Sequence, residues 1–340
     1  MSTESHHRRQ EFLASIRGKP ASPFFPDDEL ATFRDPSHPP PAGGEASFAE
    51  PWSPLRSHIH IPATFSVEVS RHLIVHLSST RTRQRPPLIL AIQGRPGDGK
   101  TEMVTECCVR VGCNTFCMSG AALSGKHEGD ARVLLLKLIA DARRRAIATE
   151  RPSVLIIDDI DRSIAALSKN TGHTVNSALL IGALHDLANQ VHSASDDMPL
   201  SRVPVVMTGN DFSTLPETLT RPGRTRFFSW CPTWREKADM ALPLFGARNE
   251  KERKRLRWLV WRYHRRGQPL AFFVQLAGEY LAAATPLPGD CRDILEAAAD
   301  FARASQSALD HLDFSRLNRL ARQLHRETAR SFLQREERNV

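Results

Sequence analysis

One eight-residue segment limits the fold of this chain more than any other feature. It reads Gly94-Arg95-Pro96-Gly97-Asp98-Gly99-Lys100-Thr101 and has the spacing of the phosphate-binding loop called Walker A. A continuous apolar run at residues 88–92 precedes it, as expected of a strand that is buried on both faces. Apolar residues at helical spacing follow it. Strand, glycine-rich turn and helix in this order form the context that supports phosphate binding.

The residue types of this loop suit ATP. Glycine lets backbone N–H groups approach phosphate oxygens without a Cβ in the way, and the following helix adds its positive end. Lys100 is expected to reach the β- and γ-phosphates, and Thr101 to bind Mg²⁺. We therefore predict that all eight residues of the loop bind the nucleotide.

A second apolar run, at residues 154–157, ends in two carboxylates. Asp158 is predicted to hold Mg²⁺, and Asp159 to polarise the attacking water. The alternative is that the two acids cap a helix. Many proteins with such a loop carry glutamate at the second position. Because aspartate is one methylene shorter, slow turnover or a shifted water is expected.

A third predicted strand, at residues 203–208, leads into Gly209 and Asn210. A polar side chain at this point would orient the lytic water, so Asn210 is a candidate catalytic residue. The alternative is a turn residue, a position that asparagine also favours.

The chain divides into four parts by its composition and predicted secondary structure. Residues 1–60 are rich in proline and are expected to form a flexible arm, with a short helix near residues 9–16. Strands and helices alternate over residues 61–232, with helices predicted at 64–77, 101–111, 130–148 and 175–191 and a strand at 115–118. Helices alone are predicted after residue 232, in a lid at 233–310 (234–244, 250–264, 269–283 and 291–309) and a basic C-terminal helix at 311–340.

The segment at residues 202–215 resembles the corresponding part of Rubisco activases nearly residue for residue. Residues 87–101, 158–161 and 228–233 are also similar, and the resemblance extends over about residues 65–280. It implies a P-loop AAA+ core, an α/β fold with a parallel doubly wound sheet, followed by an all-helical lid and C-terminal helices. It further implies ATP and Mg²⁺ as cofactors, a homo-oligomeric ring with six subunits as the expected number, and ATP-driven remodelling of a protein client whose identity stays open.

Arg221 and Arg224 flank Pro222-Gly223 just past the third predicted strand. They resemble the arginine-finger segment of AAA+ ATPases, in which an arginine from a neighbouring subunit neutralises charge on the transferred phosphoryl group. This reading places the active site between subunits. The alternative is an arginine pair on a solvated turn.

Two further interpretations remain open. The net charge is +8, and basic residues crowd residues 248–266, which would suit an ATPase that acts on nucleic acid, a loader or a regulator. A solvated helix face explains the same charges, and nucleic acid is therefore the less favoured partner. The other interpretation is a nucleotide-gated scaffold with weak hydrolysis. It rests on Asp159 and on Ala277-Gly278, which stand where relatives carry a lid arginine.

The remaining composition indicates a cytoplasmic protein. No apolar run approaches the roughly 20 residues that cross a bilayer, and the first ten residues lack the apolar core of a secretory signal. We therefore expect no membrane partner. Four of the six cysteines (Cys107, Cys108, Cys113 and Cys117) cluster without the spacing of paired metal ligands, and burial as small hydrophobic side chains is the preferred interpretation.

Overall fold

The computed structural model describes residues 47–49, 59–78, 86–120, 130–161, 182–185, 202–213, 215, 217–284, 301, 304, 309 and 312–336. The chain forms two compact units. The α/β unit comprises Met1–Ser57, Ala63–Gly94 and Lys100–Trp230, and the helical unit comprises His58–Pro62, Arg95–Gly99 and Cys231–Val340. Five residues of the phosphate loop thus belong to the helical unit, and the lysine and threonine that follow them belong to the α/β unit.

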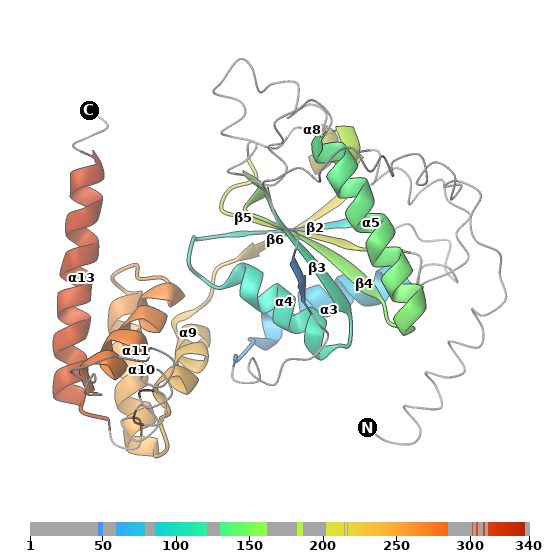
Figure 1. Ribbon diagram of the computed structural model, residues 1–340. Helices are drawn as coiled ribbons and strands as arrows, with labels where there is room; N and C mark the ends of the chain where they lie inside the picture. Colours follow the sequence, from blue (N-terminus) through green and yellow to red (C-terminus); the bar gives the residue numbers. More distant parts are fainter. Residues whose placement is uncertain are drawn as a thin grey trace, which may run out of the picture. The chain divides into compact units, whose positions relative to one another are not determined.

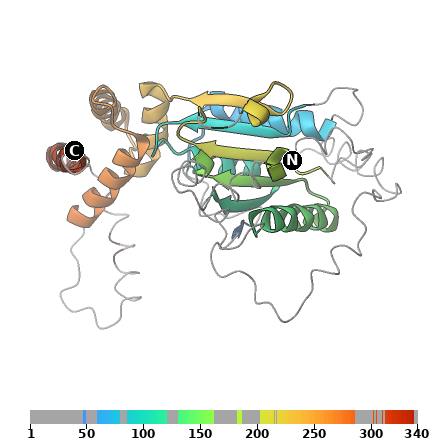
Figure 2. The same ribbon diagram turned by 90° about the horizontal axis from the view of Figure 1, so that it is seen from above.

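The α/β unit is built on a six-stranded sheet with the order β1-β3-β4-β5-β2-β6. All neighbouring pairs are parallel except β1 with β3. The strands are β1 (Ser47–Ala49), β2 (Ile89–Gly94), β3 (Asn114–Ser119), β4 (Ser153–Asp158), β5 (Val205–Gly209) and β6 (Thr225–Trp230). Figure 2 shows the stacking of the parallel strands from β6 through β2 and β5 to β4. The predicted parallel α/β core is confirmed.

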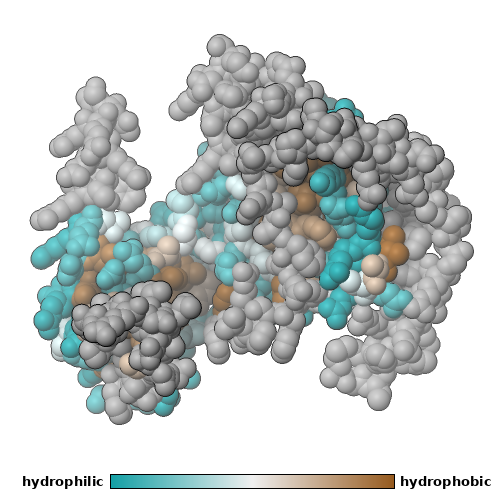
Figure 3. Space-filling view, viewed as in Figure 1, coloured by the Kyte–Doolittle hydropathy of each residue, from teal (hydrophilic) through white to brown (hydrophobic). Residues whose placement is uncertain are grey.

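Helices cover the sheet because its central strands are apolar on both faces. Leu135 and Ile139 of α5 (Asp130–Thr149) join one core cluster with Ile89 and Ala91 of β2. Their neighbours in β2 point to the opposite face, since side chains alternate along a strand. There α3 (Ala63–Ser78) and α4 (Lys100–Arg110) lie side by side (Figure 1). Hydrophilic residues cover the outer side of α5 in the space-filling view (Figure 3).

Two histidines of α3 are buried in this unit. His72 and His76 are 4% and 0% exposed, and their rings are 4.8 Å apart. The Nε2 atom of His76 lies 2.6 Å from the carbonyl oxygen of Pro87. Burial lowers the pKa of His76 to about 4. Burial, and then the neighbouring His76, hold the pKa of His72 well below its usual range. Both rings are therefore neutral in the folded protein at neutral pH.

The sequence did not predict two of the six strands. β6 follows the arginine pair directly, and only its two end residues, Thr225 and Trp230, are buried, so it lacks a continuous apolar run. The three-residue β1 lies in the stretch expected to be a flexible arm and pairs with β3, so it forms one edge of the sheet. Of the helix predicted at 175–191, only residues 182–185 are described, and they are helical. The helix predicted near residues 9–16 lies outside the described residues.

The helical unit contains α9 (Trp234–Ala241), the 3₁₀ helix η4 (Leu242–Phe245), α10 (Glu250–His264), α11 (Leu270–Ala284) and α13 (Phe314–Glu336). One apolar core joins them, and Leu317 and Ala321 of α13 belong to it together with Tyr263 and Phe273. The helix predicted at 291–309 lies almost wholly outside the described residues. The boundaries proposed at 232 and 310 stay predictions.

Local signals explain where two of these helices begin. Thr233 and Glu236 form a capping box, in which the Thr233 side chain accepts from the Glu236 backbone N–H and the Glu236 carboxylate accepts from the Thr233 N–H. Asn249 caps α10 by accepting from the N–H of Glu252. Within the described part of the chain, no helix has the length and apolar character needed to cross a membrane.

Candidate nucleotide-binding site

Three glycines give the phosphate loop its shape. Gly94 ends β2, and a Cβ placed on it would lie 2.3 Å from the carbonyl oxygen of Trp230. Gly97 and Gly99 have φ angles of 77° and 75°, which a side chain rarely tolerates. The loop backbone therefore adopts a path that only glycine permits. This is the cradle that a polyphosphate chain requires.

Lys100 begins α4 and is held in place by two oxygens. Its Nζ donates to the carbonyl oxygen of Gly94 at 2.9 Å and to Oδ1 of Asn210 at 3.2 Å. The residue is only 7% exposed. The contact joins the Walker A lysine to the residue predicted to orient water, although 110 positions separate them in the chain. The structure thus brings Lys100 and Asn210 together at the carboxyl edge of the sheet.

Three oxygens meet beside Lys100. The hydroxyls of Thr101 and Thr208 each donate to Oδ1 of Asp158 at 2.5 Å, and the two hydroxyl oxygens are 3.1 Å apart. Hydroxyl and carboxylate oxygens are the ligands that Mg²⁺ prefers. The donor set therefore fits the predicted metal ligands Thr101 and Asp158. Thr208, at the end of β5, belongs to the same cluster and was not predicted.

Asp159 follows β4 with an unusual backbone. Its φ angle is 52°, in the left-handed region that few residues other than glycine adopt. Aspartate tolerates this region better than most residues. The carboxylate predicted to polarise water is therefore attached to a strained turn, and such turns are frequent at functional sites.

Asp161 organises the turn that carries Asn210. Its Oδ2 accepts from the backbone N–H groups of Asn210 and Asp211 at 2.9 and 3.2 Å. Asp161 is 8% exposed, and its Oδ1 is a buried acceptor without a hydrogen-bond partner among the described residues. A Cβ on Gly209 would lie 2.8 Å from that oxygen. The sequence showed Asp161 only as one acid in a run, so this positioning role was missed.

Arg221 and Arg224 lie at the other end of the sheet. The register of β2 and β6 pairs Ile89 with Thr225 and Gly94 with Trp230, so the arginines come before the amino end of β6. Gly94 lies at the carboxyl end, about 16 Å away at the rise of a strand. Arg221 is exposed and lies 3.7 Å from Glu217 in α8 (Glu217–Thr220). Within one α/β unit, the two arginines therefore lie at the opposite end of the sheet from Lys100.

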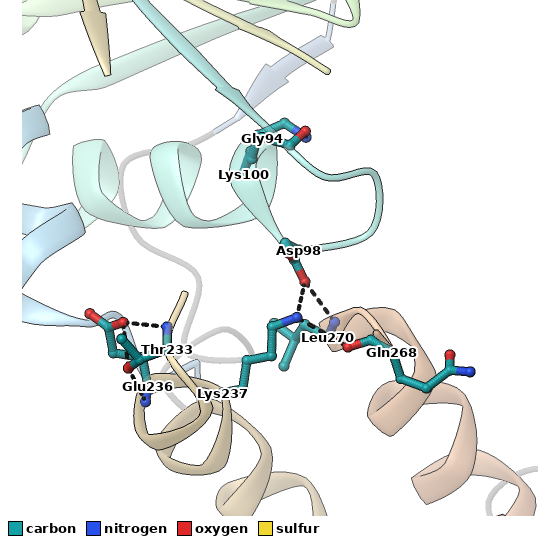
Figure 4. A network of polar contacts seen from close by, with 8 residues as sticks. All are labelled: Gly94, Asp98, Lys100, Thr233, Glu236, Lys237, Gln268 and Leu270. Carbon is teal, nitrogen blue, oxygen red and sulfur yellow. Dashed lines mark hydrogen bonds and ion pairs between the residues drawn. The ribbon is translucent and has the colours of Figure 1, made fainter. Parts of the chain in front are cut away.

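Asp98 of the phosphate loop belongs to a buried polar network in the helical unit (Figure 4). Lys237 of α9 makes a 2.9 Å ion pair with Asp98, and the two side chains are 3% and 2% exposed. Asp98 Oδ1 also accepts from the N–H of Leu270, the first residue of α11, at 2.9 Å. Lys237 Nζ donates to the carbonyl oxygen of Gln268 at 3.1 Å. No sequence pattern indicated Lys237, because a lysine in a short amphipathic helix is usually solvated.

The backbone strengthens the same connection. The N–H of Ala271 donates to the carbonyl oxygen of Gly97 at 2.8 Å, and a Cβ on Gly97 would lie 3.0 Å from that of Ala271. The Nε2 atom of Gln268 in turn lies 2.8 Å from Nδ1 of His325 in α13. Contacts therefore run from the phosphate loop through α11 to the C-terminal helix. Ala277, which was predicted to stand where relatives carry a lid arginine, lies in the apolar core of this unit.

Three of the four clustered cysteines are buried, as predicted, whereas Cys117 in β3 is partly exposed. Cys107, Cys108 and Cys113 are at most 4% exposed. Burial raises the pKa of the Cys107 and Cys113 thiols to about 12. They are therefore neutral thiols at neutral pH and act as small apolar side chains.

Comparison with known proteins gives one family and one group of relatives. Residues 90–233 match the ATPase family associated with various cellular activities (AAA). The ribulose bisphosphate carboxylase/oxygenase activase of Anabaena sp. is 34% identical over 167 residues, which are 48% of this chain and 40% of that protein. The chloroplastic activase of Vigna radiata is 32% identical over 184 residues, 51% of this chain and 41% of that protein. The matched region thus spans about two fifths of each relative.

Proposed function

We propose that the chain hydrolyses Mg²⁺-ATP at the phosphate loop and uses the energy to remodel a protein client, because residues 90–233 match the AAA ATPase family and the similar proteins are Rubisco activases. The observation that carries the ATPase proposal is the joint position of Lys100, Asp158 and Asn210. Lys100 donates directly to Asn210, and Asp158 accepts from Thr101, the residue that follows Lys100.

Each residue has a defined task in this proposal. The loop N–H groups and Lys100 bind the phosphates, because the lysine already donates to two oxygens at the edge of the loop. Thr101 and Asp158 hold Mg²⁺, which would neutralise charge that develops on the phosphate oxygens. Asn210 orients the attacking water and Asp159 polarises it. Asp161 fixes the backbone that carries Asn210.

Arg221 and Arg224 suggest that the site is shared between subunits. They lie at the opposite end of the sheet from Lys100, so they reach a phosphate loop only in another copy of the chain. A head-to-tail contact of this kind closes into a ring when the rotation permits. We therefore propose a homo-oligomeric ring, with six subunits as the expected number.

Mixing two inactive variants tests this arrangement. Lys100→Ala removes phosphate binding but leaves the arginines, whereas Arg224→Ala leaves the phosphate loop. Neither variant alone should hydrolyse ATP. An equal mixture should recover about a quarter of the wild-type rate, since random assembly places an intact loop beside an intact arginine at about a quarter of all sites. A mixture as inactive as its components would refute the shared site. Retained ATP binding with negligible wild-type turnover would instead favour the nucleotide-gated scaffold.

The client is the least defined part of the proposal. Rubisco is one candidate, because the relatives are Rubisco activases, but the resemblance covers only part of each of them. Asp159→Asn should bind ATP without hydrolysing it and so hold the client. Proteins that are recovered with Asp159→Asn in ATP, and not with Lys100→Ala, are the expected clients. The same proteins recovered with both variants would contradict ATP-dependent client binding.

A further inference from the structure

Helix α10 has one buried and one charged side. Leu256, Leu259, Val260 and Tyr263 face the core of the helical unit and are each 1% exposed. The opposite side carries cations and indoles at spacings of three and four residues, so they lie along one stripe. We call this stripe the α10 face; it consists of Lys251, Lys254, Trp258, Trp261, Arg262 and Arg265.

The other cations of this helix have partners within the helical unit. Arg257 lies 3.6 Å from Asp239, Arg253 donates to the carbonyl oxygen of Ala247 and Arg255 stacks over Phe314. None of the four cations of the α10 face has a carboxylate partner among the residues that the structure describes. The first turn also carries two acids, Glu250 and Glu252. Glu252 accepts from the backbone N–H of Arg248.

Two tryptophans on this face are open to solvent. Trp258 is 50% exposed and Trp261 is 36% exposed. A guanidinium lies over each indole ring, Arg262 at 5.2 Å from the centre of Trp258 and Arg265 at 5.3 Å from that of Trp261. Exposed indoles are costly in water. Two of them in one turn, each beside an arginine, mark a surface that binds something flat and negative.

We propose that the α10 face binds single-stranded nucleic acid. Such a strand alternates flat bases, which stack on indole rings, with phosphates, which pair with lysine and arginine. An acidic peptide would pair with the cations but would leave both indoles without a partner. The face runs from Lys251 to Arg265 and is about 21 Å long at the rise of an α-helix. This suits a site of a few nucleotides, at the lower end of the ~4–16 that binding modules of this kind cover.

This inference does not depend on ATP hydrolysis. Its test uses the full chain without nucleotide, repeated with Lys100→Ala, and measures the anisotropy of a labelled oligothymidylate of about 20 nucleotides. Affinity should fall with salt at a slope of about 0.7 per phosphate contact. Replacing both indoles (Trp258→Ala with Trp261→Ala) should weaken binding at least about tenfold, because each stacked base is lost. Replacing Arg262 and Arg265 by glutamine should lower the salt slope by about 1.4.

The chain offers a matched control on another helix. Arg235 stacks over Trp234 of α9 at 5.5 Å, so this pair has the same chemistry outside the α10 face. Trp234→Ala with Arg235→Gln should leave oligothymidylate binding unchanged. Circular dichroism of each variant should match that of the wild type, because the substituted residues of α10 are outside the core.

Three results would overturn the proposal. Binding of polyglutamate as tight as that of oligothymidylate would identify the face as a site for acidic protein. Equal binding to duplex DNA, with no loss in the tryptophan variant, would leave only a general attraction of charge. A changed oligomeric state in that variant, with oligothymidylate binding intact, would identify the face as a contact between subunits.

Discussion

Replacing Lys237 with methionine removes the cation of the buried Asp98 pair and keeps most of the side-chain stem. Both partners are almost fully buried, at 3% and 2% exposed, so water cannot replace the lost charge. Asp98 still accepts from the N–H of Leu270. Removing one partner of a buried ion pair typically costs about 3–5 kcal/mol. We expect Lys237→Met to destabilise the helical unit by this amount.

A double-mutant cycle separates the pair from the residues that make it. Asp98→Asn removes the charge and keeps an oxygen for the Leu270 N–H, so it leaves Lys237 as an unpaired buried cation. The double variant has no buried charge. Its loss should be smaller than the sum of the single losses by at least about 1.5 kcal/mol, within the range seen for residues in contact.

Urea denaturation gives the free energies, and hydrogen exchange in α9 and α11 assigns the loss to the helical unit. Asp239→Asn is the control, since it breaks the Arg257 pair, whose side chains are each 45% exposed. It should cost at most about 1 kcal/mol. Additive losses in the Asp98–Lys237 cycle, within about 0.5 kcal/mol, would refute the reasoning.

Three further predictions follow from the α/β unit. His72 and His76 bind protons more readily in the unfolded chain, where the pKa of histidine is near 6.5. The free energy of unfolding should therefore fall as pH falls from about 6.5 to about 4. For His76 alone, whose folded pKa is about 4, this loss is roughly 3 kcal/mol. A urea midpoint that is constant over this range would contradict it. Asp161→Ala removes the acceptor of two backbone N–H groups and should displace Asn210. ATP turnover should then fall about 10- to 100-fold with nearly unchanged ATP affinity. Unchanged turnover would exclude a role of Asp161 in positioning Asn210. Cys108 should react with iodoacetamide only after unfolding, since burial raises the pKa of its thiol, and rapid labelling of the native protein would contradict this.

The sequence predicted the catalytic edge of the sheet because its signals are local. Lys100 could be identified from the Walker A motif, and Asp158 and Asn210 from their positions just after apolar runs. Their meeting follows from the topology, since the carboxyl ends of parallel strands share one edge. The roles of Asp161 and Thr208 depend on hydrogen bonds across 49 and 50 positions, and no local pattern reports these.

The missed parts share a different cause. β6 lacks a continuous apolar run because only its two end residues are buried. Lys237 lies in a helix of eight residues whose sequence suggests an ordinary solvated lysine, and its burial depends on Asp98, which is 139 positions away. The sequence showed the α10 face only as a group of basic residues. Its exposed indoles became apparent once the buried side of the helix was known.

Steady-state ATP turnover tests the central claim most directly. The wild-type chain should hydrolyse ATP in the presence of Mg²⁺, and Lys100→Ala should lose both ATP binding and turnover, because Lys100 is the cation that the structure holds at the phosphate loop. The account predicts that chelating Mg²⁺ abolishes wild-type turnover as well. Turnover that persists in Lys100→Ala at the wild-type rate would contradict the assignment of this loop as the site of ATP hydrolysis.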